Sequence, residues 1–243
     1  MFMQYKFMLI MRGIWFVSQI ALFGLVVGRM VEATYSNYFQ YYVAGVTIIT
    51  LYSTSMFIGY DIFEEAEHGV FEYLLTLPVS RRELVLGRSI GGGLRSFIYV
   101  GPLLIIVLTL LGLSNPLHFM VALAGLFLFA FGVSGMSITI AVAMKSGDKY
   151  DILIGVLDAL IVRLSTTMYP AIYLREAMPT YATIANFNPL TYASDLFRWG
   201  TGVEGTLQFT PLVGVLALFV FFFSFTFVGV VFYERRLEGG SWQ

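Results

Sequence analysis

The chain has 243 residues, of which 58% are hydrophobic and 12% are charged, and its mean hydropathy is +0.80. A soluble globular chain carries roughly 25% charged residues, so water is not the only solvent of this protein. The net charge of -1 and the absence of a basic patch argue against nucleic acid as a partner. The chain has no cysteine, which excludes disulfides and thiolate chemistry.

Six apolar runs follow one another along the chain, with short connections between most of them. Because roughly twenty apolar residues cross a bilayer, we predict an all-α membrane protein that forms a single domain over residues 1–243. The six predicted transmembrane helices cover residues 13–31, 38–60, 96–113, 118–144, 152–174 and 210–232. The alternative for the first run is a cleaved signal peptide, whose apolar region is typically about 7–15 residues long, and this run is longer.

Lysine and arginine near the ends of the runs indicate the orientation, because cytoplasmic loops retain positive charge during insertion. One side of the predicted membrane carries most of them: Lys6, Arg12, Arg81, Arg82, Arg88, Arg95, Lys145, Lys149, Arg235 and Arg236. The other side carries only Arg29, Arg175 and Arg198. We therefore expect both termini in the cytoplasm.

The predicted cytoplasmic segment 61–95 is one of two long connections. Acidic residues precede Gly69, and apolar residues then recur at helical spacing until Pro78, which predicts a short amphipathic interfacial helix. Ser80 and Glu83 have the spacing of a capping box, so the next helix is expected to begin at Ser80. Arg81, Arg88 and Arg95 then repeat every seven residues along one side of that helix. They either reach lipid phosphates or belong to an element that receives force from a motor protein.

This segment resembles the one that follows the second span in ABC-2 type transporter permeases. The shared motifs are Glu67-His68-Gly69, Glu72-Tyr73-Leu74-Leu75 and Pro78-Val79-Ser80-Arg81, and Val70 replaces a threonine that is common in the family. In that family the segment contacts the nucleotide-binding subunit as a coupling helix. The resemblance implies this role for Glu67, Gly69, Phe71, Glu72, Leu74, Pro78 and Arg81.

The second long connection, residues 175–205, is predicted to be external. Asn188 followed by Pro189 is a favourable helix start, with asparagine as the N-cap. Asp195 and Arg198 stand at a pairing interval on this helix. Such a re-entrant or interfacial helix either caps the domain or gates a pathway. The block Asn188, Pro189, Tyr192, Asp195 and Arg198 also resembles the one before the last span of many ABC-2 permeases.

Asp158 and Arg163 lie inside the predicted fifth span. Each costs about 2.5–3.5 kcal/mol at a helix centre unless it is paired or hydrated. Five residues separate them, which places them about 140° apart around a helix, so each needs a partner elsewhere. They either face a hydrated pathway or a subunit interface, or they lie close to the membrane boundary.

Several kinds of chemistry have no motif in this chain. There is no phosphate-binding loop, so ATP and Mg²⁺ are expected on a partner chain, and we predict neither a cofactor nor a metal site here. Protease and esterase motifs are also missing, so we do not expect an enzyme.

The resemblance implies a multidrug-type exporter in the plasma membrane. Its expected partners are membrane lipids, a second permease subunit in a homodimer or heterodimer, and a dimer of cytoplasmic ABC ATPase subunits. Its cargo would be hydrophobic or amphipathic: a drug, a lipid or a lipid-linked glycan. The alternatives are a secondary transporter or channel that needs no ATPase, and a membrane enzyme that modifies lipids.

Overall fold

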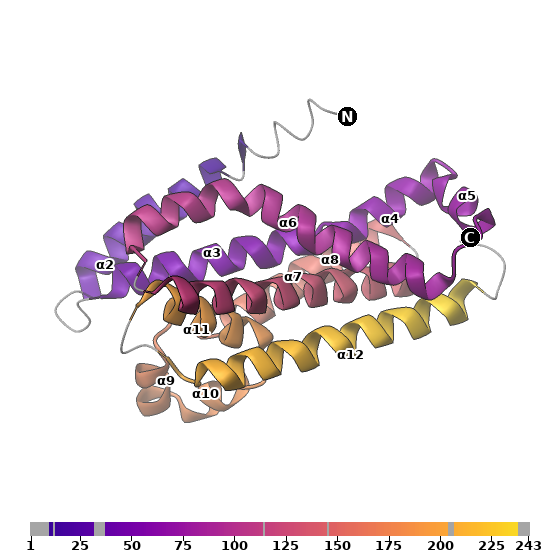
Figure 1. Ribbon diagram of the computed structural model, residues 1–243. Coiled ribbons are helices and arrows are strands. Elements are labelled where there is room, and N and C mark those ends of the chain that lie inside the picture. The colour runs from indigo at the N-terminus through magenta and orange to yellow at the C-terminus, as the bar shows by residue number, and fades with distance from the viewer. Residues whose placement is uncertain are drawn as a thin grey trace.

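The fold is a bundle of long helices that run roughly along one axis (Figure 1). The computed structural model describes residues 10–11, 13–31, 37–113, 115–144, 146–203 and 207–237. All the regular secondary structure of these residues is helical. The all-α prediction is therefore confirmed for the part of the chain that the structure describes.

The named elements follow in chain order. They are η1 (Gln19–Gly24), α2 (Leu25–Val31), α3 (Tyr38–Met56), α4 (Ile58–Glu67), α5 (Val70–Thr76), α6 (Arg81–Leu111), α7 (Pro116–Met144), α8 (Gly147–Arg163), α9 (Ala171–Ala177), α10 (Pro179–Ala185), α11 (Pro189–Thr201) and α12 (Pro211–Leu237). Figure 1 shows α5 and the end of α12 at one end of the bundle, and α9, α10 and α11 at the other. We call these the α5 end and the α11 end.

Within the part of the chain that the structure describes, five helical stretches are long and apolar enough to cross a membrane. They are Gly13–Val31, Tyr38–Glu65, Arg82–Leu111, Pro116–Met144 and Pro211–Phe232. They coincide with the first, second, third, fourth and sixth predicted spans. Two of them extend well beyond the predicted limits, because α4 continues the second stretch and α6 begins well before residue 96.

The fifth predicted span differs from the helix that forms. Helix α8 has 17 residues and ends at Arg163, whereas the apolar run continues to residue 174. Side-chain donors take up the carbonyls at its end: Ser165 Oγ donates to Val162 O at 2.7 Å, and Asn188 Nδ2 donates to Leu164 O at 3.1 Å. These bonds satisfy carbonyls that a longer helix would have used, so the chain turns there.

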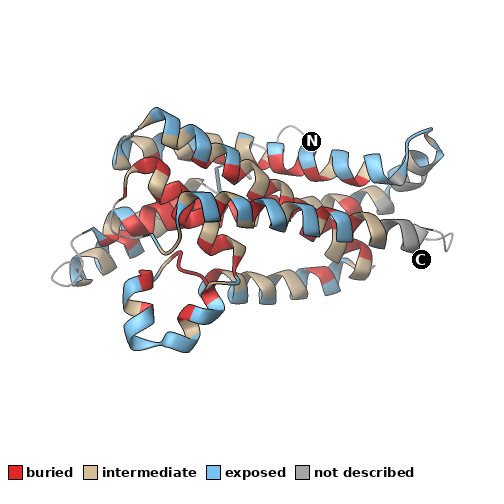
Figure 2. Cartoon of the chain, turned by 60° about the horizontal axis from the view of Figure 1, so that its bottom comes forward, coloured by how far each residue is buried: buried red, intermediate tan, exposed pale blue. Residues whose placement is uncertain are grey.

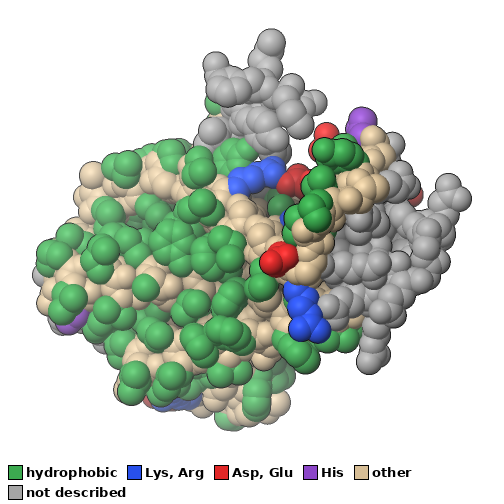
Figure 3. All heavy atoms as spheres, turned by 45° about the vertical axis from the view of Figure 1, so that its right-hand side comes forward, with side chains coloured by type: hydrophobic (Ala, Val, Ile, Leu, Met, Phe, Trp, Pro, Cys, Tyr) green, Lys and Arg blue, Asp and Glu red, His purple; other side chains and the backbone are tan. Residues whose placement is uncertain are grey.

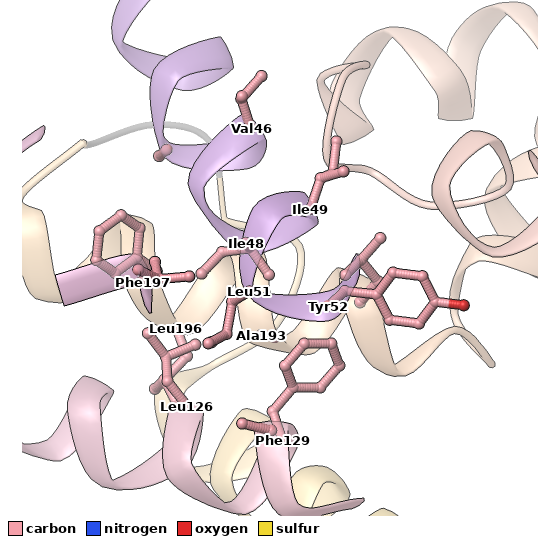
Figure 4. Packing of buried hydrophobic residues seen from close by; sticks show 14 of the residues in the cluster. Val46, Ile48, Ile49, Leu51, Tyr52, Leu126, Phe129, Ala193, Leu196 and Phe197 are labelled. Carbon is pink, nitrogen blue, oxygen red and sulfur yellow. The ribbon is translucent and has the colours of Figure 1, made fainter. Parts of the chain in front are cut away.

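The core lies where α3, α7 and α11 meet. Helix α3 is buried on nearly all sides, and α7 packs against α12, α6, α11 and α3 (Figure 2). Figure 4 shows Ile48 and Leu51 of α3 against Leu126 of α7 and Leu196 of α11. The outward faces expose large hydrophobic side chains, as expected of a protein whose surface contacts lipid.

A break at Phe57 separates α3 from α4, and polar groups of α7 and α8 hold it. The Met56 carbonyl accepts hydrogen bonds from Ser137 Oγ at 2.6 Å and from the Tyr150 hydroxyl at 2.8 Å. The Gly59 N–H donates to Ser137 Oγ at 3.0 Å. Residue 59 has to be a glycine for this packing, because a Cβ there would overlap the Tyr150 hydroxyl.

We expect Gly59→Ala to destabilise the protein by about 1–3 kcal/mol, the usual cost of overpacking a filled core. The matched control is Gly87→Ala in α6, where a Cβ meets nothing within 4 Å and where the change should stabilise the helix by about 0.5–1 kcal/mol. Thermal unfolding of the detergent-purified variants measures both effects. Equal unfolding temperatures for the two variants would contradict the packing at the break.

Candidate functional site

The first candidate site is the hairpin that α4, α5 and the first half of α6 form at the α5 end, residues 58–95. Gly69 makes the turn between α4 and α5 with a φ of 68°, a left-handed conformation that favours glycine. Ser80 caps α6: its hydroxyl accepts from the Glu83 N–H, and the Glu83 carboxylate accepts from the Ser80 N–H at 2.8 Å. The predicted capping box is thus confirmed, and α6 begins where the sequence indicated.

Two ion pairs hold α4 against α6 inside this hairpin. The Arg88 guanidinium binds the Glu65 carboxylate, and the Arg95 guanidinium binds the Asp61 carboxylate. All four side chains keep part of their surface exposed. Figure 3 shows charged side chains gathered at this end of a face that is otherwise mainly hydrophobic. Arg88 and Arg95 therefore bind acidic partners on a neighbouring helix, which the sequence pattern alone did not indicate.

The sequence assigned seven coupling residues to this hairpin. Gly69 forms the turn, Leu74 of α5 is half-buried, and Pro78 is exposed between α5 and α6. The other four occupy α4, α5 and the start of α6, and their side chains lie outside the described residues: Glu67, Phe71, Glu72 and Arg81. At the tip of the hairpin, Val70 is 41% exposed and Tyr73 is 63% exposed.

The second candidate site is α11, at the opposite end of the bundle. Asn188 is its N-cap, as predicted, because Asn188 Oδ1 accepts from the Leu190 N–H at 3.0 Å. The same side chain donates through Nδ2 to Ile161 O at 2.6 Å. Pro189 is the first residue of the helix. Asn188 thus starts α11 and ends α8 at the same point.

Arg198 is the largest side chain that is fully buried in the described structure. Its Nη2 donates to Thr167 O at 2.8 Å and to Tyr41 O at 3.4 Å, and its guanidinium lies 3.5 Å from the centre of the Tyr41 ring. The Tyr41 hydroxyl donates in turn to Tyr169 O at 3.0 Å. One guanidinium therefore joins α11, α3 and the turn after α8.

Asp195 lies one turn before Arg198, and the predicted pairing is confirmed at 3.5 Å. Its second oxygen accepts from the N–H groups of Gln208 at 2.8 Å and Phe209 at 3.1 Å. Burial raises the pKa of the Asp195 carboxyl, and the charge of Arg198 and these backbone donors counteract the rise. Asp195 thereby fixes the segment that leads into α12.

Tyr192 completes the predicted set on α11. Its hydroxyl donates to Asn186 O at 2.5 Å, and its ring stacks on Phe209 with centroids 4.6 Å apart. Trp199 of α11 stacks on His118 of α7 with ring centroids 4.2 Å apart, and both line a cavity of about 260 Å³ that Arg198 also borders. Both the polar and the apolar faces of α11 are buried.

Asp158 and Arg163 occupy different sides of α8. The Asp158 carboxylate is half-buried and accepts a hydrogen bond from Ser53 of α3, so the expected partner on another helix is present. Arg163 is the last residue of α8 and is exposed. Among the described residues, no carboxylate forms an ion pair with Arg163.

Sequence reasoning missed four residues that organise these sites: Asp61, Glu65, Tyr41 and Tyr150. Asp61 and Glu65 pair with arginines in the order that an antiparallel hairpin requires, and this complementary spacing could have revealed them. Tyr41 and Tyr150 were not identifiable in the same way, because their partners are backbone carbonyls far away in the sequence.

The fold and these sites define a helical membrane protein with a charged hairpin at one end and a tightly anchored buried helix at the other. A sequence model of the family described as ABC-2 type transporter matches residues 1–202. The chain therefore belongs to the ABC-2 type transporter family and is the permease of such a transporter. The comparison with curated proteins gives no match.

Exchanging the charges of the Asp61–Arg95 ion pair tests whether the two side chains interact in the hairpin. Asp61→Arg and Arg95→Asp each place like charges together, so each should lower the unfolding temperature, and the double variant should recover most of the loss. The coupling energy should be about 1 kcal/mol, because the pair is partly exposed. Losses that simply add in the double variant would contradict the pairing.

We expect Arg198→Met to cost about 3–5 kcal/mol, because it leaves a buried carboxylate without its counter-charge. Arg198→Lys should also destabilise the protein, since one ammonium cannot reproduce the fork that reaches several acceptors. Arg175→Met on exposed α9 is the control. Thermal unfolding in detergent compares the three, and an Arg198→Met variant as stable as the control would refute the anchoring role.

Proposed function

We propose that this permease is the membrane subunit of an exporter, and that a separate ATPase chain docks on the hairpin of residues 58–95. The observation that carries the proposal is the construction of this hairpin at the end of the bundle opposite to α11 (Figure 1). Its tip exposes Val70 and Tyr73, and its two long helices continue into the bundle. A surface of this kind suits a protein partner that pushes on it.

The contacts behind the tip form a continuous route for such a push. Ion pairs join α4 to α6, so the two helices move together. Helix α4 begins at the break beside Met56, whose carbonyl accepts a hydrogen bond from Tyr150 of α8. A displacement of α5 would therefore reach α3, α6 and α8. ATP and Mg²⁺ belong to the partner in this proposal, because the chain has no phosphate-binding loop.

The proposed topology has six crossings, with α8 as the fifth. A helix of 17 residues is about 25 Å long, slightly shorter than the roughly 30 Å hydrocarbon layer, and the turn after Arg163 supplies the remaining length. Helix α7 runs toward the α5 end and α12 starts from the α11 end, so α8 makes the return pass (Figure 1). Both termini would then be cytoplasmic, on the side of the hairpin.

The proposed transporter contains two permease subunits, identical or different, with two ATPase subunits, and lies in the plasma membrane. Its cargo is hydrophobic or amphipathic: a drug, a lipid or a lipid-linked glycan. The apolar outward faces support this cargo class, because a hydrophobic molecule can approach the bundle from the lipid phase. The buried charges are few and mostly paired, which fits such cargo better than a small ion.

The test is whether an ATPase co-purifies with the tagged permease and depends on the turn at Gly69. We expect Gly69→Val to reduce the retained ATPase about tenfold, because a β-branched residue is strained by about 1–2 kcal/mol at this positive φ. The Gly69→Asn variant should retain more of the ATPase than Gly69→Val does, since asparagine tolerates the left-handed conformation. Gly147→Ala, in open space at the start of α8, is the control.

Two results would overturn the proposal. One is equal retention of the ATPase by the wild type and the Gly69→Val variant. The other is cargo efflux from vesicles that contain the purified permease without any ATPase or nucleotide, which would favour the secondary transporter.

A further inference from the structure

Asp158 differs from the other carboxylates that the structure describes inside the bundle. The others that are buried or half-buried have an arginine as partner: Asp61 with Arg95, Glu65 with Arg88, and Asp195 with Arg198. The hydrogen-bond partner of Asp158 is the Ser53 hydroxyl. No described lysine or arginine forms an ion pair with it, so a counter-charge is missing.

The depth of Asp158 makes this missing charge costly. Its partner Ser53 lies near the middle of the apolar stretch Tyr38–Glu65. A carboxylate at the centre of a membrane helix costs about 2.5–3.5 kcal/mol without compensation. Arg163 cannot provide this compensation, because it lies five positions after Asp158 and therefore about 140° away around α8. A cation from outside the chain would offset this cost.

A second polar group, which precedes Ser53 on α3, has no hydrogen-bond partner in the described structure. The Tyr52 hydroxyl is buried, forms no hydrogen bond, and lies close enough to Asp158 for the two to interact electrostatically. Figure 4 shows this hydroxyl pointing away from the hydrophobic cluster around Leu51 and Phe129. Buried polar groups normally have partners, so an unpartnered hydroxyl within electrostatic range of a carboxylate indicates a place that a polar ligand group completes.

There is room for a ligand on the same face of α8. Gly155 lies three residues before Asp158 and hence on the same side of the helix. A Cβ at Gly155 would meet nothing within 4 Å, and Gly155 is exposed. The surface of α8 one turn before the carboxylate therefore has open space at Gly155.

We propose that Asp158, with Ser53 and Tyr52, binds the positively charged group of a lipophilic cation. This inference rests on the proposed function and names the cargo class of that permease. The carboxylate supplies the counter-charge, and the open surface at Gly155 receives the apolar part of the cargo. Selectivity for cations over anions of the same shape follows from the charge of Asp158.

The experiment measures binding to the purified full-length permease in detergent, without nucleotide or ATPase. The probes are tetraphenylphosphonium and tetraphenylborate, which share one shape and differ in charge. We expect Asp158→Asn to weaken phosphonium binding about tenfold, the effect of one lost charge contact, and not to weaken borate binding. Gly155→Phe should weaken both probes by filling the open surface. Asp148→Asn removes the same charge from an exposed site on α8 and should change neither.

Three results would overturn the inference. They are an absence of phosphonium binding by the wild type, equal binding by Asp158→Asn and Asp148→Asn, and a loss in Asp158→Asn that affects both ions alike or accompanies a changed oligomeric state. The last would assign Asp158 to subunit assembly. Because this assay needs no ATPase, its failure is distinguishable from failure of the ATPase to co-purify.

Discussion

The structure depends on one constraint: a charged or polar group inside the bundle must find its partner on another helix, because hydrocarbon provides none. Arg198 shows this constraint, with acceptors on α3 and on the turn after α8 and with Asp195 one helical turn away. Such contacts are directional, whereas apolar side chains pack almost equally well against lipid and against one another. Polar contacts therefore fix how α11 lies against α3 and the turn after α8.

Charged groups find their partners in different ways at the two ends of the bundle. At the α11 end the ion pair of Asp195 and Arg198 is buried, and both side chains also bind backbone groups. At the α5 end the pairs of Arg88 and Arg95 are partly exposed. Exposed pairs are weaker because water competes for the charges. The α11 end is thus built as a fixed anchor, and the hairpin is the end whose contacts change at lower cost.

Local signals in the sequence predicted much of this arrangement. The capping box at Ser80, the N-cap at Asn188 and the spacing of Asp195 and Arg198 each involve residues within one turn, so the sequence contains all the information they need. The end of α8 did not follow from the sequence in the same way. It depends on Asn188, which reaches Ile161 across 27 residues, and an apolar run gives no sign of such a distant donor.

Helix α8 connects the two ends and has few close contacts between them. Tyr150 binds it to the α3–α4 break, and Asn188 binds its last turn to α11. Asp158 lies between these two attachments and contacts α3 through Ser53. A shift of the break relative to α11 would change the strain on α8 and the position of the carboxylate opposite α3. The helix that carries the unpaired charge is therefore attached near both ends of the bundle.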